Sequence, residues 1–135
     1  MAALLIGILL TAALSGFSGG FSAVQIDREN SRAAQILLEK TELIRLYNWD
    51  QITGNDTNTY VPTNFTEAYY PLGTNSGGLT YSGTATITNV PLTDANYTND
   101  MRQLTVTVSW TSANVLRTRS MTTYISRYGL QNYVY

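Results

Sequence analysis

The chain of 135 residues contains no cysteine and no histidine. Without cysteine there is no disulfide framework, no thiol nucleophile and no thiolate zinc site. Without histidine the chain lacks the side chain used most often as a general base and as a metal ligand. No close pair of carboxylates stands in for these groups. We therefore expect a protein that is not an enzyme and that uses no cofactor.

Charge is scarce as well, and the formal net charge is −1. Such a balance gives no basic field to attract phosphates, so we predict no nucleic-acid partner. Charge is absent altogether from residues 1–26, whose first 14 are almost wholly aliphatic. Three interpretations of this segment are open: a cleaved secretory signal, a membrane anchor, or a helix that packs against other copies. The missing basic residue before the apolar run counts against the signal.

Residues 27–49 show the pattern of an amphipathic helix. Apolar side chains recur every three, four or seven positions from Ala33 to Tyr47, and four acids balance four bases between Asp27 and Arg45. No proline occurs before Pro62, so we predict one helix from near the N-terminus to about Asn48. A helix of roughly 45 residues is about 68 Å long, whereas a domain of this size is roughly 35–40 Å across. The apolar half is therefore predicted to project.

The remaining residues, 50–135, are predicted to form a loop followed by an antiparallel sheet. Gly, Asn and Pro mark residues 50–78 as loop, and period-two alternation then predicts strands over 79–88, 104–111 and 115–127. One apolar face of this sheet needs the helix to cover it. The fold class is thus α+β, with the helix–sheet core built from Ile36, Leu37, Ile44, Tyr47, Ile87, Leu104, Val106, Val108 and Trp110.

Two clusters of polar residues are candidate sites. In the turn Asp94-x-Asn96-x-Thr98-x-Asp100, oxygen-bearing side chains stand at alternate positions, as in calcium loops, and Asp94, Asn96 and Asp100 are the candidate ligands, although a solvated turn explains them more simply. Between Leu46 and Met101 all charged residues are acids, and from Arg102 onward all are arginines, so Arg117 and Arg119 could pair with Asp50 and Asp56 of a neighbouring copy. Pairing within one domain and simple solvation are the competing explanations.

A hydrophobic N-terminal helix that continues as an amphipathic one, followed by a small antiparallel sheet, resembles the type IV pilins and pseudopilins. The resemblance rests on MAALLIGILLTAALSGF running into NSRAAQILLEKTELIRLYNW. The family also carries a glycine before its cleavage point and a glutamate soon after it. Residues 1–6 lack the glycine and the acid. Either that segment lies upstream of Met1, which we expect, or this subunit lacks the glutamate, as some tip pseudopilins do.

The resemblance implies a subunit held in the cytoplasmic membrane until an assembly machine and a prepilin peptidase have acted. Identical subunits would then bundle their helices into an extracellular filament on the cell surface. Gly16, Gly19 and Gly20 lie where helices of this family often loosen, so the resemblance implies loosening of the helix there. The residues expected in the filament core are Leu4, Leu5, Ile8, Leu9, Leu14, Phe17 and Phe21. The alternative function is a single-span anchored β-domain that binds a ligand or partner.

Overall fold

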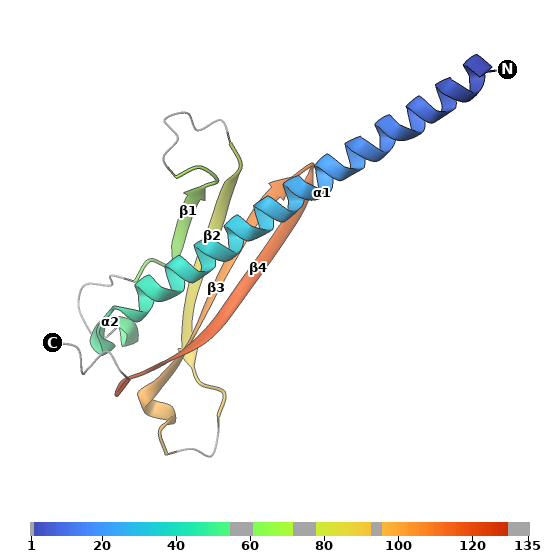
Figure 1. The fold of residues 1–135 in the computed structure, drawn as a ribbon. Helices are drawn as coiled ribbons and strands as arrows, with labels where there is room; N and C mark the ends of the chain where they lie inside the picture. Colours follow the sequence, from blue (N-terminus) through green and yellow to red (C-terminus); the bar gives the residue numbers. More distant parts are fainter. Residues whose placement is uncertain (1, 55–60, 72–77, 93–95, 130–135) are drawn as a thin grey trace. The chain divides into compact units, whose positions relative to one another are not determined.

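The computed structural model describes residues 2–54, 61–71, 78–92 and 96–129, with side chains from residue 6 onward. The chain forms two units, Met1–Arg32 and Ala33–Tyr135, and helix α1 runs through both. The elements in order are α1 (Ala2–Arg45), α2 (Trp49–Thr53), β1 (Asn64–Ala68), β2 (Thr80–Asn89), the 3₁₀ helix η1 (Thr98–Asp100), β3 (Met101–Ser112) and β4 (Val115–Ser126) (Figure 1). This is the predicted α+β fold.

Helix α1 is continuous over its 44 residues. Gly16, Gly19 and Gly20 lie within it, although each costs about 1 kcal/mol relative to alanine. The helix ends at Arg45, earlier than the predicted end at Asn48. Asn48 instead caps α2: its side chain accepts a hydrogen bond of 2.8 Å from the Gln51 amide, and the Gln51 side chain accepts one from the Asn48 amide. This capping box stops one helix and starts the next.

The sheet has four antiparallel strands in the order β1-β2-β3-β4. The hairpin between β3 and β4 turns on two residues, Ala113 and Asn114, which have φ angles of 49° and 63°. Two consecutive left-handed residues define the type I′ turn, whose twist matches that of the strands it joins. The turn fixes a register in which Val106 lies opposite Met121.

Strand β1 and helix α2 correct the prediction that residues 50–78 are loop. β1 pairs along β2 from Asn64 to Ala68 and puts Phe65 opposite Gly83. A Cβ atom added to Gly83 would lie only 2.1 Å from the Phe65 ring, so the ring occupies the space that a side chain would fill. This fit between a glycine and an aromatic ring depends on tertiary structure. The composition of residues 50–78 does not reveal it and predicts a loop instead.

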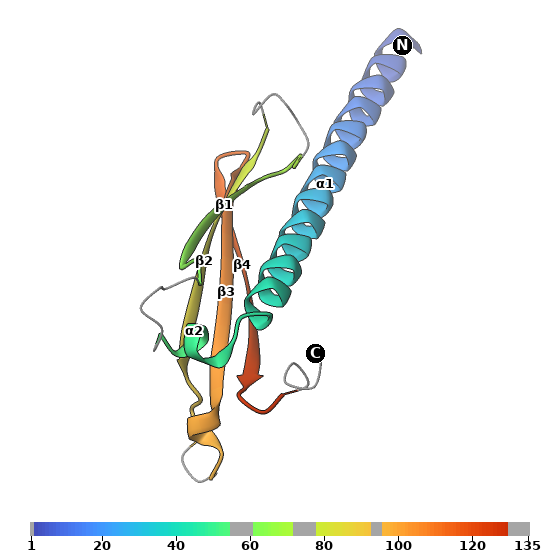
Figure 2. The same ribbon diagram turned by 90° about the vertical axis from the view of Figure 1, so that its left-hand side faces the viewer.

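Residues 33–45 of α1 cross one face of the sheet in both views of the ribbon (Figures 1 and 2). The predicted core residues Ile36, Leu37 and Ile44 are buried there against Leu104, Val106, Val108 and Trp110, while Tyr47 and Ile87 are half-buried. Tyr81 is fully buried, with its ring centroid 5.4 Å from that of Trp110.

Polar contacts flank this core on both sides. On the β1 side, the Lys40 ammonium group lies 2.5 Å from the Glu67 carboxylate and 5.3 Å from the Phe65 ring centroid. On the β4 side, the Thr41 hydroxyl lies 3.7 Å from the Met121 sulfur. These contacts orient the helix segment across the strands.

Candidate functional site

The N-terminal part of α1 presents apolar side chains to its surroundings. Leu9 is 69% exposed, Phe17 67% and Phe21 75%. Among the described residues, this is the one helix that is long and apolar enough to cross a membrane. No residue in its most apolar stretch of 18 residues is buried. Thr11, the first hydroxyl in the segment, donates to the Gly7 and Ile8 carbonyls of its own helix. The surface therefore suits a lipid or protein environment better than water.

Six of the large apolar side chains in this segment lie on one face of the helix. Their spacings are four, four, three, four and three residues, which at 100° per residue keeps them within an arc of about 80°. We call this set the apolar stripe: Ile6, Leu10, Leu14, Phe17, Phe21 and Val24. Of the residues predicted to lie in the filament core, Leu14, Phe17 and Phe21 belong to the stripe, and Ile8 and Leu9 lie outside it. Ile6, Leu10 and Val24 belong to the stripe by the same helical spacing, and packing in a filament stays a prediction for all of them.

The rest of the helix circumference from Thr11 to Ala23 carries small residues. A Cβ atom on Gly16, Gly19 or Gly20 would meet nothing within 4 Å, so packing inside this chain does not explain these glycines. Small residues let neighbouring helices approach closely. Loosening of the helix at these glycines stays a prediction about the assembled state. The side chains of Leu4 and Leu5 lie outside the described residues.

The second surface is the face of the sheet opposite the core. Alternation puts the outward side chains of neighbouring strands opposite one another, as in the row of Asn64, Thr84, Thr107 and Ser120. We call the Ser, Thr and Asn residues in the middle of this surface the hydroxyl face: Asn64 and Thr66 of β1, Ser82, Thr84, Thr86 and Thr88 of β2, Thr105, Thr107 and Ser109 of β3, and Thr118, Ser120 and Thr122 of β4. Toward the ends of β3 and β4 the same side of the sheet also carries Met101, Gln103 and the exposed Leu116 and Tyr124. The β2 and β4 members are exposed, and the β3 members are half-buried.

Charge is missing from this surface. Among the described strand residues, Glu67, Arg102, Arg117 and Arg119 are the charged ones, and their positions in the alternation put them on the core side. A shallow hollow of about 510 Å³ lies over β1, β2 and β3, lined by Asn64, Phe65, Thr66, Ser82, Gly83, Thr84, Thr107 and Ser109. A hydrogen bond of 3.2 Å joins the Thr105 and Thr122 hydroxyls beside it.

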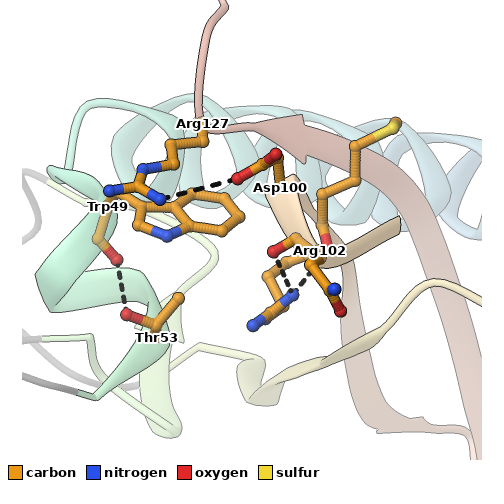
Figure 3. A network of polar contacts seen from close by, with 7 residues as sticks. Trp49, Thr53, Asp100, Arg102 and Arg127 are labelled. Carbon is orange, nitrogen blue, oxygen red and sulfur yellow. Dashed lines mark hydrogen bonds and ion pairs between the residues drawn. The ribbon is translucent and has the colours of Figure 1, made fainter. Parts of the chain in front are cut away.

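A polar network holds α2 at the end of the sheet (Figure 3). The Arg102 guanidinium lies 5.2 Å from the Trp49 ring centroid and donates to the Met101 and Asn99 carbonyls at 2.8 and 3.2 Å. The Arg127 guanidinium lies 3.6 Å from the Asp100 carboxylate, and its backbone amide donates to the Asp100 carbonyl at 2.8 Å. The network fixes η1 and the ends of β3 and β4, which is a structural role.

Of the predicted calcium ligands that the structure describes, Asp100 belongs to this network, and its carboxylate faces Arg127. Asn96 is exposed, and Asp94 lies outside the described residues. Across the part of the chain that the structure describes, no group of three His, Cys, Asp or Glu side chains could hold a metal ion. The calcium site stays a prediction.

The predicted inter-subunit charges lie on different elements of the described structure. Arg117 and Arg119 share the core side of β4, with Arg117 half-buried and Arg119 exposed, and Asp50 is exposed in the first turn of α2. Asp56 lies outside the described residues. Pairing of these groups between copies stays a prediction.

Comparison with family models, with curated proteins and with solved structures gives no match. The apolar stripe offers dispersion and packing, and the hydroxyl face offers neutral donors and acceptors. These two surfaces are the candidate binding surfaces of the described structure.

Proposed function

We propose that this chain is the structural, non-catalytic subunit of a type IV pilus-like or pseudopilus filament on the cell surface. The observation that carries the proposal is α1 itself. One uninterrupted helix supplies the exposed apolar stripe at residues 6–24 and the buried core contacts of Ile36, Leu37 and Ile44. The same helix can therefore join a filament core and hold a β-domain.

Burial of the apolar stripe in a bilayer or against a partner is favourable in free energy. Burial of a large apolar side chain stabilises by about 1.5–3 kcal/mol, so the six stripe residues together represent on the order of 10 kcal/mol. A helix with this surface does not remain alone in water. Its two possible environments are a bilayer and a bundle of identical helices.

Before assembly the helix would lie in the cytoplasmic membrane. Exchange of lipid for neighbouring helices adds little hydrophobic free energy, because lipid tails are as apolar as leucine. Side-chain packing and close backbone approach must then favour the bundle, and an external machine must supply the work of extraction. The resemblance to type IV pilins suggests the pilus assembly machinery for this extraction, and prepilin peptidase as the enzyme that processes the subunit beforehand.

The alternative is a β-domain anchored permanently by a single membrane span. The length and composition of α1 suit it equally. The two functions differ in what the stripe does, because lipid tolerates changes of side-chain shape that a packed helix bundle does not. The stripe is therefore the place to separate them.

The test compares two leucines in α1 with the same change. Leu14 belongs to the stripe and is 67% exposed, whereas Leu9 lies outside it and is 69% exposed. For a filament subunit, the chain should appear in thin filaments sheared from cells, and Leu14→Ala should lower the filament yield more than Leu9→Ala. Membrane insertion, measured by carbonate extraction, should be equal for both variants.

Two results contradict the proposal. One is recovery of the chain only in the detergent-soluble membrane fraction, never in sheared filaments. The other is an equal filament yield for Leu14→Ala and Leu9→Ala, which removes the stripe from the assembly surface.

A further inference from the structure

The hydroxyl face departs from an ordinary solvent-exposed surface in having no charge among its described residues. About 25–35% charged residues is the range recommended for a soluble surface in protein design, and oppositely charged cross-strand pairs stabilise an exposed sheet. Here all the strand charges are on the core side, and hydroxyl faces hydroxyl in successive rows. Threonine's preference for strands explains part of the pattern. It does not explain why no lysine or glutamate interrupts a four-strand face.

We propose that the hydroxyl face binds a neutral, hydroxyl-rich polysaccharide, seated over the hollow between β1 and β3. Each Ser or Thr hydroxyl can both donate and accept, as can each sugar hydroxyl, so the two can pair in either direction. Rows of these groups repeat at about 4.8 Å across the strands and about 6.7 Å along them. Threonine methyl groups between the hydroxyls provide contact for the C–H faces of a sugar ring.

The residues that line the hollow favour a sugar over a protein partner. Cores of protein–protein interfaces are rich in aromatic side chains, methionine and arginine. The hollow has one aromatic residue in its described lining, Phe65, and no methionine or arginine. Its other side chains are neutral and polar, among them the Asn64 amide and the hydroxyls of Thr84 and Thr107, which lie directly opposite each other. Removal of a neutral polar group from water costs less free energy than removal of a charged group. A shallow neutral site of this kind suits a neutral ligand.

Shallowness also determines the strength of binding. The hollow is open, so each chain should hold its ligand weakly. A filament that repeats the face along its length would gain avidity on a polymeric ligand. The binding itself does not depend on the filament, and it can be measured on the single full-length chain.

The experiment uses the full chain in a zwitterionic detergent without a sugar headgroup. Depletion of the protein from solution is measured on cellulose, chitin and mannan, with alginate as the anionic comparison. The test variant is T84V/T107V, which removes two facing hydroxyls while keeping shape and strand preference. The matched control is T123V, the same change on the core side of β4. Near-UV circular dichroism and thermal unfolding show that all three proteins are folded.

The expected result is saturable binding to at least one neutral polysaccharide, weakened about tenfold in T84V/T107V and unchanged in T123V. Binding should persist in about 1 M NaCl, because no charge on the face takes part. Three results overturn the proposal: binding to alginate alone with loss in salt, equal binding by T84V/T107V, or self-association of the chain through this face without polysaccharide binding. None of these results bears on filament assembly.

Discussion

Leu37 and Leu38 are neighbours in α1 with opposite surroundings, and they test whether residues 33–45 belong to the core of the β-domain. Leu37 is 3% exposed among sheet residues, whereas Leu38 is 52% exposed. The change to alanine removes the same atoms and alters helix propensity equally at both positions. Any difference between the two variants therefore reports burial.

The expected magnitudes follow from that burial. Leu37→Ala should lower the free energy of unfolding by about 2–5 kcal/mol, because it removes packed methylenes and leaves a cavity. Leu38→Ala should cost about 1 kcal/mol or less, because half of the side chain already contacts solvent. In a domain of roughly 100 residues each kcal/mol shifts Tm by about 4–8 °C. The Leu37 variant should therefore melt at least about 8 °C below the unmutated chain and at least about 4 °C below the Leu38 variant.

The assay is thermal unfolding of the full chain in detergent, followed by near-UV circular dichroism. Trp110 is 2% exposed and contacts Tyr81, so its signal reports the core of the sheet. Equal shifts of Tm for Leu37→Ala and Leu38→Ala would refute the packing of this helix segment on the sheet.

Three further predictions address the sheet and its charges. Gly83→Ala should cost about 1–3 kcal/mol in urea unfolding, because the added methyl group would overlap the Phe65 ring; in a Phe65→Ala background the cost should nearly vanish, and a persistent cost would refute the fit. Ala113→Gly should stabilise by about 0.5 kcal/mol, since Ala113 has a φ of 49°, while an unchanged or lower urea midpoint would contradict strain at this turn. Arg117→Glu with Arg119→Glu should reduce filament yield and leave near-UV circular dichroism unchanged; normal assembly would remove these arginines from the interface.

Much of the fold is predictable because its elements are half-buried and therefore periodic. Val106 and Val108 alternate with threonines because one face of β3 packs under α1, and that alternation predicts the strand. Residues 33–45 of α1 are predictable for the same reason, at the helical period. In both cases burial of one face produces a periodic pattern of apolar residues in the sequence.

The two elements that the sequence did not predict, β1 and α2, lack such a periodic pattern. β1 has one half-buried aromatic residue, Phe65, and its place depends on the empty space above Gly83, far away in the sequence. α2 is five residues long, and its signal was only Asn48 followed by Gln51 three positions later. The hydroxyl face needs the strand register to reveal which threonines are neighbours.

The central claim is that the apolar stripe becomes buried against identical helices. Because the chain has no cysteine, single cysteines report burial without background. Sheared, membrane-free material from cells carrying Phe21→Cys or Thr107→Cys is treated with a membrane-impermeant maleimide. We expect Thr107→Cys to be labelled and Phe21→Cys to be protected, although Phe21 is 75% exposed in the single chain. Equal labelling of the two cysteines, or absence of the chain from the sheared material, would contradict it.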